Sequence, residues 1–252
     1  MDNNQLGPHT FPFVIHGKHT PNIADTIFRY LDQKTLAKSR LVSKVWKDYI
    51  DWKTLLWGKV SKDQYIKAAK EGRLDICRLI IRKAENKNPA SDRFFRTPLH
   101  EAALKGHLEI CRLIIENVSN KNPADVHVMT PLHNVTGFGQ PGHLDVCRLI
   151  LENIENKSPV DKFGRTPLHV AAMQGELEMC RILIETMEEK NPPNARGETP
   201  LHWAAKRNHP EVCRLIISQV EELHPVDHDG NTPLDKARSY QYQDVIDVFE
   251  GK

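Results

Sequence analysis

Hydrophobic residues from position 61 onwards recur with the spacing of short amphipathic helices, and the whole pattern repeats about every 33 residues. Each unit has a first, shorter apolar stretch, which usually contains an Ala-Ala pair. A second stretch follows, in which Cys-Arg precedes a run of Leu and Ile. The second stretch occurs five times, with its cysteines at Cys77, Cys111, Cys147, Cys180 and Cys213. The pattern predicts an all-α fold, built as a stack of helix pairs.

Most units begin their first helix with the same tetrapeptide, Thr-Pro-Leu-His. The Thr can cap the helix, and the Pro suits its first turn. Full copies start at Thr97, Thr130, Thr166 and Thr199, and a fifth copy at Thr232 ends in Asp. With a period of about 33 residues, this tetrapeptide resembles the ankyrin repeat. The resemblance implies a solenoid over residues 61–252 with β-hairpin loops, and we place its six repeats at residues 61–91, 92–124, 125–160, 161–193, 194–226 and 227–252.

Residues 21–57 follow a different pattern, with three short apolar stretches and no tetrapeptide. Ile23, Ile27, Phe28 and Leu31 share one face of a helix. A segment this small cannot bury its large side chains alone, so a partner or a neighbouring repeat must cover them. One interpretation is a helical cap on the first repeat. Residues 1–20, which are mostly polar, are expected to form a mobile tail.

The same segment also resembles an F-box. The family pattern matches Ile27-Phe28 followed by Leu31, then Leu36, Val42 with Trp46 four residues later, and a late Leu-Trp pair. Two positions depart from it: Thr20 replaces a Leu, and Pro21 is one residue closer to Ile27 than usual. The resemblance implies docking on the Skp adaptor of a cullin-RING ubiquitin ligase, which the missing Leu is expected to weaken. The residues expected to contact the adaptor are Pro21, Ile23, Ile27, Phe28, Leu31, Leu36, Val42 and Trp46.

In the ankyrin family, hairpin tips and first helices form a surface that binds other proteins. The matching positions here are rich in aromatic, Met and Arg residues, which are enriched in protein interfaces. Phe95 and Val128 stand where the family prefers Gly, so their hairpins are expected to be distorted. The alternative is that the rings are partly packed and the cations only solvate the surface. The residues expected to contact a target protein are Arg93, Phe94, Arg96, Leu104, His127, Met129, Phe138, Lys162, Phe163, Arg165, Met173, Arg196, Trp203, Lys206 and Arg207.

The net charge limits the classes of partner that we expect, and the cysteines indicate the cellular compartment. The net charge is only +2, so we expect neither nucleic acid nor membrane as a partner. No secretory leader pattern and no long apolar run occurs, which favours the cytoplasm or nucleus, or a host cytosol if the chain is a secreted effector. Equivalent cysteines of neighbouring helices lie ~8–10 Å apart, too far for a disulfide. We therefore expect free, buried thiols in a reducing compartment.

Three patterns invite a chemical role that we do not assign. Residues 137–142 match Gly-x-Gly-x-x-Gly but lie between two predicted helices, in a three-residue insertion that exposes Phe138 as a contact loop or a tolerated extension. His107 and His143 each stand four residues before a Cys, yet a zinc site needs four ligands. The Thr-Pro-Leu-His histidines are expected to hydrogen-bond to backbone. We predict no catalytic residue, no metal and no cofactor, and hence no enzyme.

Together these patterns favour the substrate-recognition subunit of an SCF-type cullin-RING ubiquitin ligase. The F-box would dock the Skp adaptor and the ligase core, and the repeats would bind a target protein, as a monomer within the complex. The alternative is an ankyrin-repeat scaffold or inhibitory binding protein without any ligase, whose N-terminal helices act as a cap. The identity of the target does not follow from the sequence.

Overall fold

The computed structural model describes residues 61–251. By its internal contacts the chain divides into two compact units, Met1–Trp52 and Lys53–Lys252, and the described residues belong to the second. Within that part there are twelve helices and no strand. The helices are α4 (Lys62–Lys70), α5 (Leu74–Lys83), α6 (Pro98–Leu104), α7 (Leu108–Ile115), α8 (Pro131–Val135), α9 (Pro141–Asn153), α10 (Pro167–Gln174), α11 (Leu177–Thr186), α12 (Pro200–Lys206), α13 (Pro210–Ile217), α14 (Pro233–Ser239) and α15 (Gln243–Glu250).

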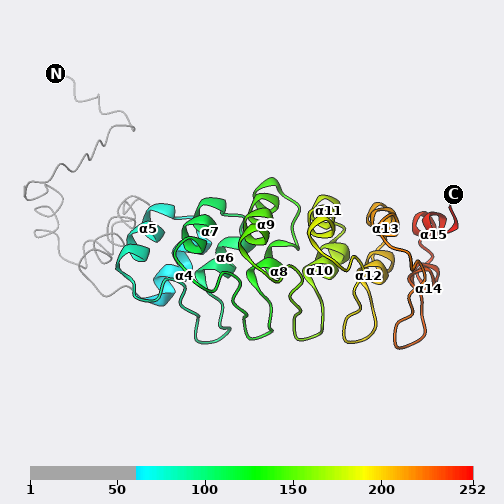
Figure 1. Ribbon diagram of the computed structural model, residues 1–252, viewed down its shortest axis with the longest axis horizontal. Helices are drawn as coiled ribbons and strands as arrows, with labels where there is room; N and C mark the ends of the chain where they lie inside the picture. Colours follow the sequence, from blue (N-terminus) through cyan, green and yellow to red (C-terminus); the bar gives the residue numbers. More distant parts are fainter. Residues whose placement is uncertain (1–60, 252) are drawn as a thin grey trace, which may run out of the picture. The chain divides into compact units, whose positions relative to one another are not determined.

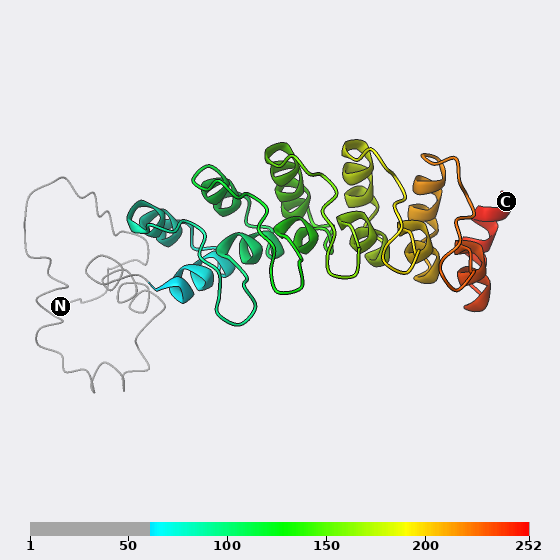
Figure 2. The same cartoon turned by 60° about the horizontal axis from the view of Figure 1, so that its bottom comes forward.

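The helices form antiparallel pairs that stack side by side in chain order (Figure 1). The first helices, α4, α6, α8, α10, α12 and α14, make one layer, in which each packs on the next. The second helices, α5, α7, α9, α11, α13 and α15, make the other, which we call the second-helix layer (Figure 2). The predicted all-α stack is confirmed. None of the described helices combines the length and the apolar character that a membrane crossing requires.

The core lies between the two layers and follows the apolar positions of the sequence. All five cysteines are free and buried, as predicted, and burial raises the pKa of Cys147 and Cys213 to about 12. Ile114 and Ile150 are likewise 0% exposed. The cysteines therefore pack as small apolar residues between neighbouring repeats rather than as reactive thiols.

The Thr-Pro-Leu-His tetrapeptide joins each repeat to the next. The backbone N–H of Thr97 donates to Nδ1 of His100 (3.1 Å), which leaves the proton on Nε2. That nitrogen donates to the carbonyl of Met129 in the following repeat (3.1 Å). The other three histidines make the same pair of bonds. The prediction that these histidines bond to backbone is confirmed, and burial lowers the pKa of His100 and of His169 to about 4.

A hairpin loop precedes every tetrapeptide, although none of these loops contains a strand. Five of them project in a row that we call the hairpin edge, residues 91–96, 125–129, 161–165, 194–198 and 227–231 (Figure 1). Each hairpin is closed by a backbone bond, such as the one from Asp161 N–H to the carbonyl of Arg165 (2.9 Å). A further bond links it to the hairpin before it, as from Ala195 N–H to the carbonyl of Phe163 (3.0 Å). The edge is therefore a hydrogen-bonded row rather than a set of independent loops.

The predicted distortion of two hairpins is right for one and wrong for the other. Val128 adopts a left-handed φ of 59° and donates to Asp125 as Gly164 does to Asp161, so its hairpin keeps the common shape. The first hairpin differs, because its closing bond runs from Ser91 to Arg96 and spans one more residue. The shape of the first hairpin therefore differs because it contains one extra residue, and not because it lacks Gly.

Candidate protein-binding site on the hairpin edge

The structure places the expected target-contacting residues at or near the surface. The exposed members are Arg93, Phe94, His127, Phe138, Lys162, Phe163, Arg196 and Arg207. Half-buried members are Arg96, Leu104, Met129, Arg165, Met173, Trp203 and Lys206. Exposure alone does not show binding, so the contacts that each side chain makes decide which of them remain available.

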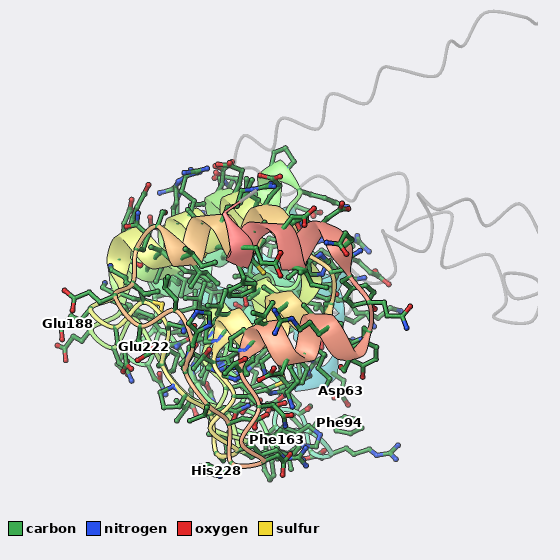
Figure 3. The ribbon with its side chains drawn as sticks, turned by 90° about the vertical axis from the view of Figure 1, so that its right-hand side faces the viewer. Asp63, Phe94, Phe163, Glu188, Glu222 and His228 are labelled. Atoms are coloured by element: carbon green, nitrogen blue, oxygen red, sulfur yellow. The ribbon has the colours of Figure 1, made fainter. Side chains whose placement is uncertain are left out.

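Aromatic rings at the hairpin tips are accompanied by cations. The ring of Phe94, 46% exposed, has the guanidinium of Arg93 at 5.0 Å from its centroid. Phe163, 51% exposed, has Lys162 Nζ at 4.8 Å and the guanidinium of Arg165 at 5.0 Å. Figure 3 shows both rings at one edge of the stack. Exposed rings paired with cations offer a partner both apolar area and positive charge.

A hollow of about 260 Å³ lies between the hairpins that precede α10 and α12. Phe163 and Trp203 supply its aromatic surface, and Ala195 supplies only a methyl group. Gly164 permits the two hairpins to approach, since a Cβ there would lie 2.7 Å from the backbone nitrogen of Ala195. The hollow is lined by Lys162, Phe163, Arg165, Asn194, Ala195, Arg196, Glu198 and Trp203.

Some of the expected contact cations are held by buried acids of the repeats themselves. Arg165 pairs with Asp161 at 2.7 Å, and Arg96 pairs with Glu101 at 3.2 Å. Burial tends to raise the pKa of Asp161, but hydrogen bonds from Arg165 and from the backbone outweigh it and hold the pKa below its usual value. These two arginines therefore stabilise their hairpins, which supports the structural alternative for them.

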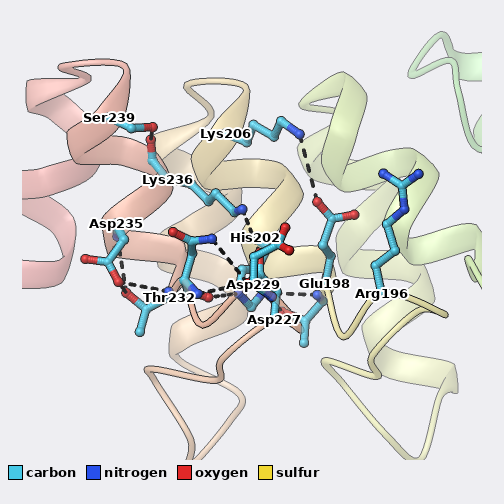
Figure 4. Close-up of polar contacts among 12 residues, drawn as sticks. Arg196, Glu198, His202, Lys206, Asp227, Asp229, Thr232, Asp235, Lys236 and Ser239 are labelled. Carbon is cyan, nitrogen blue, oxygen red and sulfur yellow. Dashed lines mark hydrogen bonds and ion pairs between the residues drawn. The ribbon is translucent and has the colours of Figure 1, made fainter.

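Other cations have no acidic partner within residues 61–251. No ion pair in this region involves Lys162 or Arg196, although Lys162 Nζ lies 2.9 Å from Nδ1 of His127. In Figure 4 no dashed line joins Arg196 to Glu198, whose carboxylate is instead joined to Lys206 at 3.9 Å. The charges of Lys162 and Arg196 are therefore available to a partner.

The last hairpin keeps the same polar framework but loses the aromatic rings. Asp227 is buried and pairs with Lys236 at 2.6 Å (Figure 4). Burial opposes ionisation, yet the bonds from Lys236 and Asn231 lower the pKa of Asp227 to about 2. The tip itself carries His228 and Asp229. Along the edge, the last exposed Phe is therefore Phe163 and the last Lys or Arg is Arg196.

The second row of histidines serves packing between repeats. His107 Nε2 donates to the carbonyl of Lys70, His143 to that of Leu104 and His209 to that of Met173, each at 3.2 Å. In the part of the chain that the structure describes, no three His, Cys, Asp or Glu side chains gather as metal ligands. The His–Cys spacing is therefore explained by hydrogen bonding and burial.

The insertion in the third repeat is packed rather than free. Phe138, 40% exposed, stacks on His143 with ring centroids 5.0 Å apart. Gly139 lies so close to Glu176 that a Cβ would come within 1.8 Å of its carboxylate oxygen. No strand precedes this segment in the described chain, so the dinucleotide-binding context is missing. The loop presents one ring to solvent from a fixed position.

Sequence reasoning missed three residues of the hollow, Asn194, Ala195 and Glu198. Asn194 belongs to a row of Asp or Asn five residues before each tetrapeptide, and its Oδ1 accepts from the backbone of Arg196 (2.8 Å) and Glu198 (3.0 Å). That fixed spacing was visible in the sequence and could have located the hairpin turns. The small side chain of Ala195 does not indicate a hollow until the residues around it in space are known.

Comparison with known families assigns the two parts of the chain separately. The model for ankyrin repeats (3 copies) matches residues 65–159, 118–194, 139–222 and 186–249, and the model for the F-box domain matches residues 21–57. A comparison with curated proteins gave no match. The expected adaptor contacts lie outside the described residues: Pro21, Ile23, Ile27, Phe28, Leu31, Leu36, Val42 and Trp46.

Proposed function

Because the chain belongs to the ankyrin-repeat family and carries an F-box domain, we propose that it is the substrate-recognition subunit of an SCF-type cullin-RING ubiquitin ligase. The observation that carries the proposal is the presence of both modules in one chain. F-box domains and ankyrin repeats are protein-interaction domains rather than catalytic ones. In this role the F-box docks the Skp adaptor, and the hairpin edge holds a target protein.

The proposed mechanism is proximity. A target held on the repeats is tethered to the ligase core through the adaptor, which raises the effective concentration of its lysines near the ubiquitin-conjugating enzyme. The bonded row of hairpins supports this role, because a rigid surface loses less conformational entropy on binding than a mobile one. An interface of standard size buries about 1,600 Å² in total, which three or four neighbouring repeats can supply.

Adaptor binding tests the proposal. We expect the double variant Ile27→Asp, Trp46→Ala to lose recovery of a tagged Skp adaptor in a pull-down, because both changes fall in the F-box segment. The matched control is Phe163→Ala with Trp203→Ala, which alters the lining of the hollow and should recover the adaptor as wild type does. Circular dichroism must show that both variants keep their repeats folded. Equal recovery of the adaptor from wild type and the F-box variant would refute the proposal.

Deletion of residues 1–57 separates this function from the scaffold or inhibitor alternative. The ligase proposal expects residues 61–252 to remain folded and to bind the target without the adaptor. If the N-terminal helices are only a cap, the deletion should unfold or aggregate the repeats, and no adaptor should be recovered from the full chain. Proximity labelling with wild type and the F-box variant would identify the adaptor and the target in one experiment.

A further inference from the structure

The hollow between the third and fourth hairpins, residues 161–165 and 194–198, combines two features that the rest of the edge does not bring together. It offers two large aromatic rings, and it holds two cations that lack acidic partners in the described chain. We propose that this hollow binds an acidic segment of the target protein. An Asp or Glu carboxylate meets Lys162 and Arg196, and a neighbouring apolar side chain packs on Phe163 and Trp203. The inference rests on the proposed function, in which the repeats hold a target.

The charge balance of the hollow favours an anion. Lys162, Arg165 and Arg196 line it, against a single carboxylate, that of Glu198. The charge of Arg165 is largely used by buried Asp161, and that of Glu198 is shared with Lys206 and Asn194. What remains for a ligand is the positive charge of Lys162 and Arg196. A partly enclosed site strengthens such attraction relative to open solvent.

The aromatic part of the hollow sets a second requirement. Phe163 is half exposed and held by cations on its flanks, and Lys206 Nζ lies 5.3 Å from the centroid of the Trp203 ring. The Trp203 Nε1–H is the one buried polar atom of the lining without a hydrogen-bond partner. An acceptor on the bound segment would satisfy this donor if the indole turns toward it. Rings of this kind are common anchors of binding energy in protein interfaces.

Acidic residues on another side of the stack would help to orient an acidic partner. Exposed glutamates concentrate at the C-terminal ends of the second helices and in the loops that follow. Figure 3 shows Glu188 and Glu222 on a different side from Phe94, Phe163 and His228. These glutamates are Glu85, Glu116, Glu152, Glu155, Glu185, Glu188, Glu189, Glu221 and Glu222. Repulsion there and attraction at the hairpin edge steer an acidic segment toward the hollow.

Selection from a phage-displayed library of random peptides tests the proposal on the full 252-residue chain. We expect enriched peptides to place Asp or Glu next to an aromatic or aliphatic residue. Measured by fluorescence anisotropy, their affinity should fall ~10-fold or more in Lys162→Glu, Arg196→Glu, and should weaken with added salt. The control Arg112→Glu, Arg148→Glu makes the same charge change on the second-helix layer and should alter affinity less than twofold.

A second variant tests the hollow independently, in case the first variant does not fold. Ala195→Glu places a carboxylate in the hollow at an exposed position where other hairpins carry Val126, Lys162 and His228, so the backbone accepts a large side chain. It should reduce peptide affinity by a similar factor while thermal unfolding stays unchanged. Enrichment of neutral or basic peptides, or wild-type affinity in both hollow variants, would overturn the proposal.

The form of the anion and the link to the ligase are tested in parallel arms. If a peptide binds only when its acidic residue is replaced by phosphoserine, the carboxylate assignment is overturned. Adaptor recovery should be normal in the hollow variants. If the adaptor is recovered but acidic peptides are not selected, this inference fails and the proposed function stands. If acidic peptides bind and the adaptor is never recovered, the proposed ligase role fails instead.

Discussion

The second-helix layer and the hairpin edge both repeat at the same period, but they differ in what their arginines contact. Along the second-helix layer, four of the five arginines that follow a Cys pair with an acid three residues earlier, as Arg112 does with Glu109 at 3.9 Å and Arg181 with Glu178 at 3.5 Å. On the hairpin edge, Arg196 has no acidic partner within residues 61–251. The arginines of the second-helix layer are mostly paired with acids of the same layer, whereas the charge of Arg196 on the hairpin edge is available to another molecule.

The largest effect expected on stability comes from a fall in pH, which acts on the buried tetrapeptide histidines. Burial lowers the pKa of His100 and His169 to about 4, so they are neutral when folded and take up protons near pH 6.5 when unfolded. Stability is therefore lost as pH falls from about 6.5 towards 4. Between pH 7.5 and 5 we expect a loss on the order of 4 kcal/mol, measured by urea unfolding.

The matched control for pH replaces exposed histidines of the hairpin edge. His127→Ala and His228→Ala remove exposed rings at the tips of two hairpins. Their unfolding free energy should show the same decline with pH as wild type. An unfolding free energy that stays level between pH 7.5 and 5 in wild type would contradict the assignment of the decline to the buried histidines.

A core truncation gives the next largest effect. Ile114 is 0% exposed between the layers, so Ile114→Ala should lower the free energy of unfolding by ~3 kcal/mol through lost burial and a cavity. Phe163→Ala removes a larger side chain, yet one that is 51% exposed, and should change stability by less than ~0.5 kcal/mol. Target binding should show the opposite order, provided that the Ile114 variant is assayed where it is still folded.

The fold was largely predictable because each repeated residue has one local or nearest-neighbour role. The cysteines, the tetrapeptide histidines and the helix pairs all follow from spacing and burial. The edge was less predictable, because its properties depend on residues a full repeat apart. That Arg165 is engaged by Asp161, while Arg196 is not engaged by Glu198, depends on side-chain directions that spacing does not specify.

Val128 marks a further limit of prediction and leads to a smaller test. The absence of the Gly that the ankyrin family prefers indicated a distorted hairpin, but the row of bonds between hairpins imposes the left-handed turn on Val despite its steric cost. Val128→Gly should therefore stabilise the protein by ~0.5–1 kcal/mol, after the entropy loss of Gly is deducted. The reverse change, Gly164→Val, should destabilise it, since a Cβ would lie 2.7 Å from the backbone nitrogen of Ala195. Thermal unfolding of both variants measures the difference, and destabilisation by Val128→Gly would contradict the imposed turn.

The smallest effect on stability distinguishes the two kinds of arginine most directly. Arg112→Ala breaks an exposed pair with Glu109, and such pairs contribute ~0.2–0.5 kcal/mol, so stability should fall by about that amount while target binding is unchanged. Arg196→Ala breaks no ion pair within the described chain, so unfolding should be unaffected while binding of an acidic peptide weakens. Each variant should therefore change one of the two measured quantities, stability or binding, and leave the other as in wild type. If Arg196→Ala destabilises the fold and leaves peptide binding intact, Arg196 makes a contact within the protein that stabilises it. The hairpin edge would then be a structural surface, as the second-helix layer is.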